Sequence, residues 1–412
     1  MKNCDVLIIG GGPSGAIAGA NLAQKGFSVE IVEKLDFPRF IIGESLLPHC
    51  NAILSKNGLL DRIQRQGYLL KAGAIFENEA KEQEIYHFRE NIGEPHNTTF
   101  QVKREEFDDE LLKGAEEFGA TVTHGVEVTE YNQDENIVKA IDRDGNSIEY
   151  KARFVLDASG YGRVLARLQE LETPSELKPR KAIFTRIEND IRPKGELGGY
   201  ITIFVHGDNE AWIWVIPFID GSTSVGIVCE DDYYDRMNMT PEEFWDYIIA
   251  NDANAKERFK NATKINPVGK IDGYSSNIKT MFGKGFAIAG NATEFLDPVF
   301  SSGVTLALVS GDLAADLIAK ELNGEEVDWQ VEYQDQVMIG VDVFREFVLA
   351  WYDGRLQKIF FSPLKQEMFT RSISSILSGY VWNKKNIFVK NTKKKMDSLI
   401  EMIDEATNTE LV

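Results

Sequence analysis

A glycine-rich loop near the N-terminus constrains the fold of this chain more than any other segment. Residues 4–9 (CDVLII) form a continuous apolar run, which is typical of a parallel strand buried on both faces. Gly10, Gly12 and Gly15 follow in the pattern G-x-G-x-x-G, and residues 16–24 predict a helix. Residues 27–33 predict a second strand. These segments together predict a βαβ unit whose loop and helix N-terminus bind a pyrophosphate.

The residue that ends the second strand indicates what the pyrophosphate belongs to. Glu33 lies eighteen residues after Gly15. A carboxylate there can accept hydrogen bonds from both ribose hydroxyls, and it disfavours a 2′-phosphate. We therefore predict a dinucleotide site, with a chance glycine turn as the alternative. The neighbouring Pro13, Ser14 and Lys34 are expected to bind the same cofactor.

Further segments extend this unit into an α/β fold. Residues 101–102, a strand near 121–130 and the apolar run 154–156 are expected in the same sheet, with a helix over 105–118. The alternating residues 137–150 predict a hairpin that turns at Asp144-Gly145. A buried strand over 286–289 and a helix over 304–321 return the chain to this sheet.

The hydrophobic pattern of the sequence changes near residue 181. Four segments between 181 and 230 are β-rich and alternating, which predicts an antiparallel sheet with one face over a ligand. A helix is expected over 241–260, and the chain beyond 330 looks helical. The fold class is therefore α/β with three parts: a Rossmann-like nucleotide-binding domain (1–70, 100–170 and 271–325), an inserted, mostly antiparallel substrate-binding β-sheet domain (71–99 and 171–270) and a helical C-terminal region (326–412).

Charge and cysteine content exclude several classes of partner. The formal net charge of −20 opposes nucleic acid or an anionic bilayer as the main partner. The three cysteines fit neither a disulfide framework nor a zinc site, so a reducing cytoplasm is expected. The five histidines are scattered without metal-ligand spacing, and no metal is expected. The sequence has no run of eighteen apolar residues, so no integral membrane segment is expected.

Two later segments indicate which dinucleotide is bound. Residues 285–290 (GFAIAG), followed by Asn291 and a helix near 304, resemble the second flavin motif of the p-hydroxybenzoate-hydroxylase superfamily. That family usually has Asp at this position, and Asn291 can still bond a ribityl hydroxyl. Residues 157–160 (DASG) resemble the family's middle segment, and the GYGR at 160–163 is interpreted as a turn. The resemblance implies FAD as cofactor. The sequence has no second G-x-G-x-x-G in a βαβ context, so a separate nicotinamide domain is not expected.

Three further segments narrow the resemblance to flavin-dependent halogenases that act on phenols or carrier-tethered pyrroles. They are Arg39 with residues 43–48 (GESLLP), residues 212–217 (WIWVIP) and residues 295–303 (FLDPVFSSG). Similarity in order and spacing covers roughly residues 1–325. In such enzymes reduced flavin and oxygen convert bound chloride into hypochlorous acid, and a lysine holds or transfers the electrophilic chlorine. The resemblance also implies these cofactor-binding residues: Arg39, Ser45, Arg104, Asn291, Pro298, Gly303 and Val304.

The candidate catalytic lysine is Lys71, in the segment YLLKAGA at 68–74. Its apolar neighbours would desolvate the ammonium and lower its pKa, which strengthens a hydrogen bond to hypochlorous acid. The alternative is a surface lysine whose head reaches into solvent. Glu44 is the carboxylate expected near the flavin, and its role as an acid or a base is open.

A halide or substrate site is expected around the other two signatures. The backbone N–H groups of Ser301, Ser302 and Gly303 precede a helix and can bind a halide or the flavin carbonyl, with Ser302 as a catalytic candidate. An ordinary serine N-cap is the alternative. Trp212 and Trp214 alternate on a strand and are expected to line the wall between flavin and substrate, or else to form a core pair.

The leading hypothesis is a halogenase-like FAD-dependent oxidoreductase that modifies an aromatic or lipid-like small molecule through reduced flavin and oxygen. The substrate is either free or tethered to a carrier, and the electrons come from a flavin reductase or from NAD(P)H. An aromatic-ring monooxygenase and a prenyl-chain or polyene reductase are alternative enzymes on the same fold. A non-catalytic flavin-binding protein is the alternative from another class.

Overall fold

A parallel sheet carries the N-terminal βαβ unit. The computed structural model describes residues 1–207, 209–364 and 366–410. Strands β20, β10, β1, β2 and β7 lie side by side in this order, and each neighbouring pair is parallel. The bounds of these strands and of the edge strand β19 are β1 (Lys2–Ile9), β2 (Val29–Glu33), β7 (Thr121–His124), β10 (Ser147–Asp157), β19 (Phe282–Gly283) and β20 (Phe286–Ile288). The predicted parallel sheet is confirmed.

Both faces of this sheet are covered, as the apolar run of its central strand predicts. Val6 and Ile8 of β1 pack in one hydrophobic cluster, whereas Leu7 and Ile9 pack in another on the opposite face. The first cluster joins the sheet to α1 (Pro13–Gln24), α4 (Arg104–Glu117) and α9 (Ser302–Leu322). The second cluster includes residues of β8 (Glu127–Asn132), β9 (Ile137–Ile141) and α5 (Val164–Leu168). Strands β9 and β10 form the predicted hairpin.

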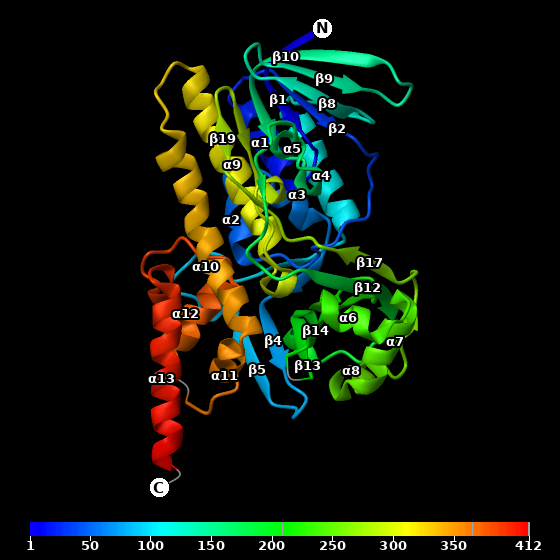
Figure 1. The fold of residues 1–412 in the computed structure, drawn as a ribbon, viewed down its shortest axis with the longest axis vertical. Coiled ribbons are helices and arrows are strands. Elements are labelled where there is room, and N and C mark those ends of the chain that lie inside the picture. Colours follow the sequence, from blue (N-terminus) through cyan, green and yellow to red (C-terminus); the bar gives the residue numbers. More distant parts are fainter. Residues whose placement is uncertain (208, 365, 411–412) are drawn as a thin grey trace.

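A second, mostly antiparallel sheet lies below the first in Figure 1. In spatial order it contains β16 (Thr263–Lys264), β12 (Arg180–Glu188), β15 (Thr223–Glu230), β14 (Ala211–Pro217), β13 (Ile201–His206), β4 (Gly73–Glu77) and β5 (Gln83–His87), and β17 (Gly269–Asp272) also pairs with β12. Trp212 and Trp214 face the main cluster, whereas Ile213 and Val215 face α6 (Asp231–Met237) and the two helices that follow it. The antiparallel sheet predicted over 181–230 is confirmed, and β4 extends it by a parallel pairing with β13.

The segment around Gln101 does not join the parallel sheet. β6 (Thr99–Gln101) pairs with β3 (Leu69–Lys71) in a separate two-stranded sheet. The flanking backbone is also bonded elsewhere, because Leu46 N donates to Phe100 O at 3.1 Å and Val102 N donates to Glu44 O at 2.8 Å. The prediction was wrong because a short apolar run does not show which segment will satisfy its backbone groups.

Two longer elements are interrupted. The strand predicted near 121–130 is divided into β7 and β8, and the helix predicted over 241–260 is divided into α7 (Pro241–Asn251) and α8 (Ala253–Arg258). Asp252 separates the helices because its backbone is extended and its carboxylate accepts hydrogen bonds from two N–H groups in the first turn of α8. An Asp in this position acts as an N-cap and starts a new helix.

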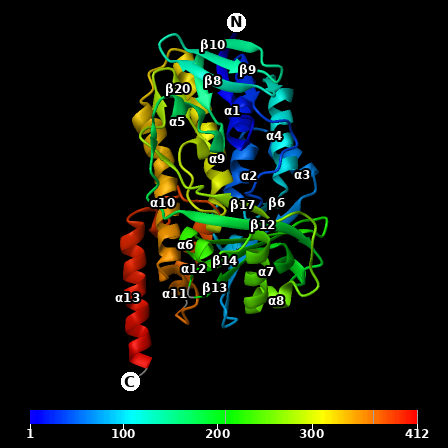
Figure 2. The ribbon, with the colours of Figure 1, turned by 45° about the vertical axis from the view of Figure 1, so that its right-hand side comes forward.

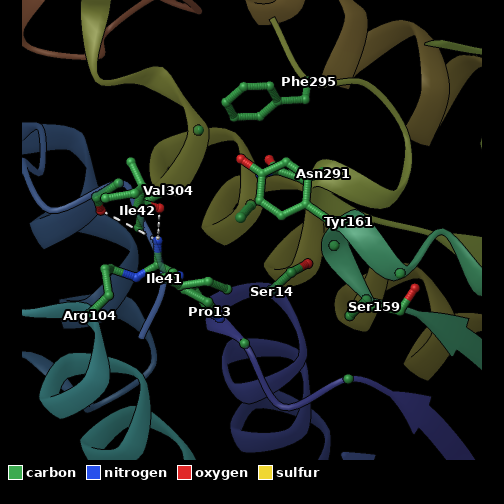
Figure 3. Close-up of a pocket in the computed structure, with 18 of the residues that line it drawn as sticks. Pro13, Ser14, Ile41, Ile42, Arg104, Ser159, Tyr161, Asn291, Phe295 and Val304 are labelled. Atoms are coloured by element: carbon green, nitrogen blue, oxygen red, sulfur yellow. Dashed lines mark hydrogen bonds between the residues drawn. The ribbon is translucent and has the colours of Figure 1, made fainter. Parts of the chain in front are cut away.

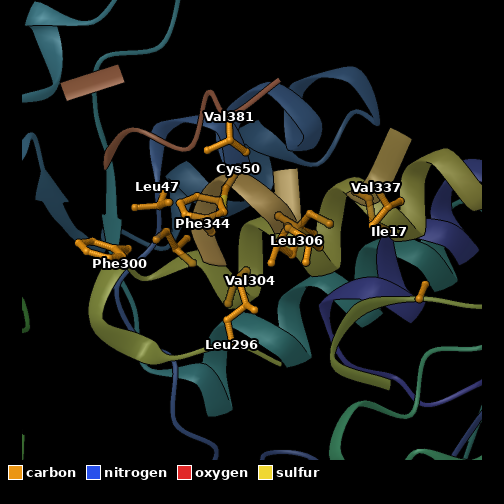
Figure 4. Close-up of a cluster of buried hydrophobic side chains, with 14 of the residues drawn as sticks. Ile17, Leu47, Cys50, Leu296, Phe300, Val304, Leu306, Val337, Phe344 and Val381 are labelled. Atoms are coloured by element: carbon orange, nitrogen blue, oxygen red, sulfur yellow. The ribbon is translucent and has the colours of Figure 1, made fainter. Parts of the chain in front are cut away.

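A helical region follows α9, as predicted. After a π-helical turn over Trp329–Gln334, it contains α10 (Asp335–Tyr352), α11 (Arg355–Phe360), α12 (Glu367–Leu377) and α13 (Thr392–Glu410). Helix α13 leads away from the sheets to the C-terminus in Figures 1 and 2. Phe344 of α10 packs with Leu47 and Phe300 in the core (Figure 4), so the helical region shares the main hydrophobic cluster. Among the described residues, the remaining short α-helices and β-strands are α2 (Pro48–Lys56), α3 (Leu60–Arg65), β11 (Glu172–Thr173) and β18 (Asn277–Ile278), and several single 3-10 turns connect the elements.

Candidate functional site

The glycine loop brings backbone atoms to the edge of a cavity. Gly10 has φ +100°, and a Cβ atom there would lie 2.6 Å from the carbonyl oxygen of Ala158. A Cβ at Gly15 would collide with the carbonyl oxygen of Gly10, so this glycine lets helix α1 pack closely on its loop. A Cβ at Gly12 would lie 3.3 Å from Nη2 of Arg39. The backbone of this loop is therefore accessible from the cavity, next to the cationic side chain of Arg39.

The cavity has a volume of about 740 Å³ and extends from this loop to the antiparallel sheet. Figure 3 shows side chains that reach it from the segments that follow β2, β10 and β20 and from α1, α4 and α9. The sequence-predicted residues that line it are Gly10, Gly12, Pro13, Ser14, Glu33, Lys34, Arg39, Glu44, Ser45, Arg104, Trp214, Asn291, Pro298, Ser301, Gly303 and Val304. Segments far apart in the sequence are thus brought to one cavity.

Several polar groups at this cavity have room for a further partner. The hydroxyl oxygens of Ser14 and Ser45 and the Oε2 atom of Glu44 are buried and have no hydrogen-bond partner within the described part of the chain. Glu33 accepts hydrogen bonds at 2.8 Å from the N–H groups of Gly11 and Leu35, one on each carboxylate oxygen. Each of these oxygens keeps a second lone pair. The donors and acceptors fit a polar ligand such as a dinucleotide.

Three charged side chains fix the loop that carries the GESLLP segment. Arg104 binds Asp108 through Nε at 2.7 Å and Nη2 at 2.9 Å. Its Nη1 donates to the carbonyl oxygens of Ile42 and Gly43, as the dashed lines in Figure 3 show. Arg39 binds the same Asp108 at 3.2 Å. The loop between β2 and α2 is therefore tied to α4 through its backbone.

Glu44 is held from the other side by the antiparallel sheet. Its side chain is 1% exposed, and Nη2 of Arg186 donates to its Oε1 at 2.6 Å. Burial raises the pKa of Glu44 above its ordinary range, although the guanidinium of Arg186 opposes the shift. Arg186 also binds Glu105 of α4, at 2.5 Å. One cation thus joins two carboxylates from different segments beside the cavity.

The F-x-x-P-x-x-S-x-G segment presents a helix end to the cavity. Ser301 adopts the left-handed conformation with φ 55°, and α9 begins at Ser302. Ser301 and Gly303 line the cavity, whereas Ser302 is buried beneath them. The N–H groups of the first turn of α9 have no partners within the helix and favour negative charge. Asn291 lines the same side of the cavity (Figure 3).

Lys71 is enclosed by protein. Its side chain is 1% exposed, which contradicts the alternative of a surface lysine. Nζ donates to the carbonyl oxygen of Leu46 at 2.8 Å and lies 5.3 Å from the centre of the Phe88 ring. Burial lowers the pKa of Lys71 to about 7, and the nearby thiol of Cys50 opposes this shift. Lys71 does not line the cavity but lies behind the segment whose Ser45 does.

The two tryptophans of WIWVIP have different positions. Trp214 lines the cavity, and its Nε1 donates to Oγ of Ser224 at 3.2 Å. Trp212 was expected on the same wall but lies behind it, 1% exposed, with its Nε1 donating to Oη of Tyr352 at 2.8 Å. The rings share one face of β14, as the alternation predicts, at a centroid distance of 6.1 Å. Helix α10, whose last residue is Tyr352, thus takes the space that would expose Trp212.

Sequence reasoning missed three aromatic residues of the cavity. Tyr161, Tyr274 and Phe295 line it, and the ring of Phe295 lies 5.4 Å from that of Tyr161 and 5.5 Å from that of Tyr274. Figure 3 shows Tyr161 and Phe295 on the same side of the cavity. The first residue of the F-x-x-P pattern could have indicated Phe295. Tyr161 was assigned only to a turn, and Tyr274 has no local signal.

Comparison with known proteins decides which dinucleotide family this is. A family model for the FAD binding domain matches residues 3–335. The chain belongs to this FAD-binding family. The glycine cradle, the buried hydroxyls without partners and the acceptor at Glu33 agree with FAD as the cofactor.

The relatives of this FAD-binding protein include halogenating enzymes. It is 28% identical over 422 residues to a chlorinase of 1H-pyrrole-2-carbonyl peptidyl-carrier protein from Pseudomonas fluorescens, with 96% of this chain and 94% of the relative covered. A brominase of the same named substrate, from Pseudoalteromonas luteoviolacea, is 31% identical over 340 residues, with 81% of each chain covered. The chain is therefore a halogenase-like FAD-dependent oxidoreductase.

A solved structure agrees over the whole fold. The crystal structure of a flavoprotein/dehydrogenase from Cytophaga hutchinsonii is 42% identical and matches with a TM-score of 0.94, covering 98% of this chain and 100% of that one. Helix α9 is long and apolar enough to cross a membrane, but 78% of its apolar stretch is buried in the fold. Its packing against α1 identifies it as a core helix.

Proposed function

We propose that this chain halogenates an electron-rich aromatic ring, a phenol or a pyrrole, with FAD, oxygen and a halide. The observation that carries the proposal is Lys71, which is enclosed beside the GESLLP segment with a pKa near 7. A lysine of this pKa is partly neutral at pH 7, so it can donate a hydrogen bond to hypohalous acid or accept the halogen on nitrogen. Because Nζ is bonded to Leu46 O and does not line the cavity, this role requires that hypohalous acid pass the GESLLP segment to reach it. The relatives named as a chlorinase and a brominase support a halide as co-substrate.

The net reaction balances without a further oxidant. A ring C–H, a halide ion, a proton, reduced FAD and O₂ give a ring C–halogen bond, oxidised FAD and two molecules of water. Reduced FAD supplies two of the four electrons that reduce O₂ to water, and the halide and the ring C–H together supply the other two. The protein supplies binding, orientation and exclusion of water. Reduced FAD comes from a flavin reductase or from reduction by NAD(P)H.

Different residues of the cavity bind different parts of the cofactor. The loop at Gly10 and Gly12 accepts the pyrophosphate, Glu33 accepts the ribose hydroxyls and Asn291 bonds the ribityl chain. Further contacts are assigned to Pro13, Ser14, Gly15, Lys34, Arg39, Ser45, Arg104, Pro298 and Val304. Gly15 acts by packing rather than by contact, since it does not line the cavity.

The reacting end lies near the antiparallel sheet. The N–H groups of Ser302 and Gly303 bind the halide or the flavin carbonyl, because a helix N-terminus favours negative charge. The N–H of Ser301, which the sequence assigned to the same role, instead donates to the carbonyl oxygen of Pro298 at 3.0 Å. Trp214 forms part of the wall that excludes water. Glu44 has a raised pKa and can hold a proton at Oε2, for which the described residues provide no hydrogen-bond partner.

A second candidate is a flavin-dependent dehydrogenase or reductase that moves hydrogen without halide or oxygen insertion. The 42% identical structure titled a flavoprotein/dehydrogenase favours it. A monooxygenase would consume oxygen but not halide. We further propose a cytoplasmic location and a substrate that is free or carrier-tethered, and the names of the two relatives support the tethered form.

The test supplies reduced FAD, oxygen and chloride or bromide with a panel of free and carrier-tethered phenols and pyrroles, and reads product masses. Lys71→Ala should reduce halogenated product by about 100-fold or more, because the lysine acts on the electrophilic halogen. FAD binding and reoxidation of the flavin by oxygen should stay near wild type. Lys71→Arg should not restore product, because a guanidinium stays protonated.

Lys181→Ala is the matched control, since Lys181 is also buried but pairs with Asp235 on the outer face of the sheet. It should keep full product formation. Full turnover of a confirmed substrate by Lys71→Ala would contradict the role of Lys71. Hydroxylated product, or hydrogen transfer without oxygen uptake, would favour the monooxygenase or the dehydrogenase.

A further inference from the structure

A buried carboxylate lies directly behind the cavity wall. Asp297 is 2% exposed and precedes Pro298, which lines the cavity. Its Oδ1 accepts a hydrogen bond from Val299 N at 3.1 Å. Its Oδ2 accepts from Oη of Tyr352 at 2.9 Å and from Oη of Tyr274 at 3.3 Å. Asp297 thus caps its own turn and also accepts hydrogen bonds from two separate parts of the fold, at Tyr274 and at Tyr352.

A second layer of side chains surrounds these donors. Nε1 of Trp212 donates to Oη of Tyr352 at 2.8 Å, so the tyrosine hydroxyl accepts one bond and donates another. The guanidinium of Arg180, 4% exposed, lies 3.3 Å from the centre of the Tyr352 ring. Burial raises the pKa of Asp297, and the positive charge of Arg180 is the largest effect that opposes it. The carboxylate is thus compensated by a cation across a tyrosine ring.

The segment that Asp297 holds has little regular structure of its own. Pro298–Phe300 forms one 3-10 turn, capped by the carboxylate of Asp297, and Ser301 follows in the left-handed conformation. The left-handed conformation is strained for a serine and persists only where its surroundings fix it. The segment nevertheless delivers Pro298, Ser301 and Gly303 to the cavity. The shape of this segment therefore depends on the hydrogen bonds that Asp297 accepts on the side away from the cavity.

We propose that Asp297 is a positioning residue of the flavin site, which fixes the loop from Pro298 to Gly303 and couples it to helix α10 through Tyr352. The C-terminal helical region thereby helps to set the affinity and the redox potential of bound FAD. Tyr352 is the last residue of α10, so this helix meets the flavin-facing loop at its C-terminal end. The inference rests on FAD binding and does not require the proposed halogenation.

Asp297→Asn tests the carboxylate with little change in shape. The amide keeps one oxygen for Val299 N, but it removes the charge and an acceptor for the two tyrosines. The Kd for FAD should rise by about tenfold or more, as expected for loss of bonds to a charged acceptor. The absorption bands of bound flavin should shift, and its midpoint potential should become more positive because a nearby negative charge is lost. Tyr352→Phe should raise the Kd and shift the absorption bands in the same direction, by less. Its midpoint potential should change without becoming more positive, because the negative charge of Asp297 stays and loses a hydrogen-bond donor.

Tyr234→Phe is the matched control. It removes a buried tyrosine hydroxyl that donates to Met239 O at 3.0 Å, in the cluster on the opposite face of the antiparallel sheet. It should lower Tm without changing the affinity, spectrum or potential of FAD. If Asp297→Asn and Tyr352→Phe lower Tm but leave these three flavin properties as in Tyr234→Phe, Asp297 is a structural cap alone and the proposal is overturned.

Tyr352→Phe decides the outcome alone if Asp297→Asn does not fold. Unchanged FAD affinity and spectrum in that variant would overturn the coupling to α10. Trp212→Phe supplies a further step, because it removes only the outer donor to Tyr352 and should give the smallest shift. Neither readout needs a substrate or halide, so a failure of the proposed function would leave this test intact.

Discussion

At the scale of single residues, Lys71 combines full enclosure with an ionisable group. Its side chain is 1% exposed, and Nζ has one hydrogen bond within the described residues, to the carbonyl oxygen of Leu46. Burial lowers the pKa of Lys71 to about 7, whereas a lysine in an unfolded chain titrates near about pH 10.4. The folded chain therefore binds fewer protons here than the unfolded chain between these two values.

This difference predicts a pH-dependent stability. Between about pH 7 and about pH 10 the contribution of Lys71 to the free energy of unfolding should rise with pH, by at most about 1.4 kcal/mol per pH unit. Below about pH 7 both states carry the proton, and the penalty for a buried charge is complete. Lys71→Met should therefore be more stable than wild type at about pH 6.5, and the gain should shrink by about pH 9.5.

Urea unfolding of both proteins at these two pH values measures the change. All other groups are shared, so their titration cancels in the difference between wild type and Lys71→Met. A stability difference that stays the same at both pH values would mean that Lys71 keeps its ordinary pKa in the folded protein.

At the scale of elements, the close contact of α1 with α9 depends on Gly311. A Cβ atom at this position would meet the carbonyl oxygen of Ser14 in the first turn of α1. That turn faces the cavity with Pro13 and Ser14. Gly311→Ala should therefore displace the N-terminus of α1 and raise the Kd for FAD by about tenfold, because pyrophosphate binding depends on its N–H groups.

Gly340→Ala provides the comparison for this measurement. Gly340 lies in α10, and a Cβ there would meet the ring of Trp382, away from the cavity. Both variants should lower Tm, because both overpack a helix contact. A fluorescence titration with FAD should distinguish them, since Gly340→Ala keeps the wild-type affinity. Equal affinities in the two variants would mean that α1 tolerates the added methyl group.

Elements with strong local patterns were predictable from the sequence. The βαβ unit, the hairpin at Asp144-Gly145 and the antiparallel sheet over 181–230 are confirmed, because periodicity and turn residues determine them locally. The partner of Gln101 and the interruption at Asp252 were missed because side-chain caps and backbone partners from elsewhere decide them. The proposed domain limits stay a prediction.

The same division applies to the candidate site. The glycine loop, Glu33 and the signature segments were found because their residues follow one another in the sequence. Asp297 occupies a variable position of its signature, and its partners Tyr274 and Tyr352 lie in segments without a motif. Tertiary contacts of this kind leave no periodic or local pattern to read.

At the scale of the whole molecule, Arg186 joins the two sheets around the cavity. It lies on β12 of the antiparallel sheet and binds Glu44, in the loop after β2, and Glu105, in the first turn of α4. Arg186 is 8% exposed and Glu44 is 1% exposed, so solvent screens their interaction little. Breaking such a buried pair leaves one charge without compensation, which commonly costs about 3–5 kcal/mol.

Arg186→Met should therefore destabilise the protein by about 3–5 kcal/mol at about pH 8, and by less at about pH 5. Without the guanidinium, burial alone acts on Glu44, and its folded-state pKa rises further above the unfolded value. The protonated form is then favoured by folding, so stability increases as the pH falls through the folded-state pKa. Adding Glu44→Gln should recover part of the loss at about pH 8 and remove most of the extra pH dependence, because the amide is neutral at both values. Urea unfolding of wild type and the two variants at both pH values measures these stability differences. If Arg186→Met has the same pH dependence as wild type, Glu44 must find another partner when the cation is removed.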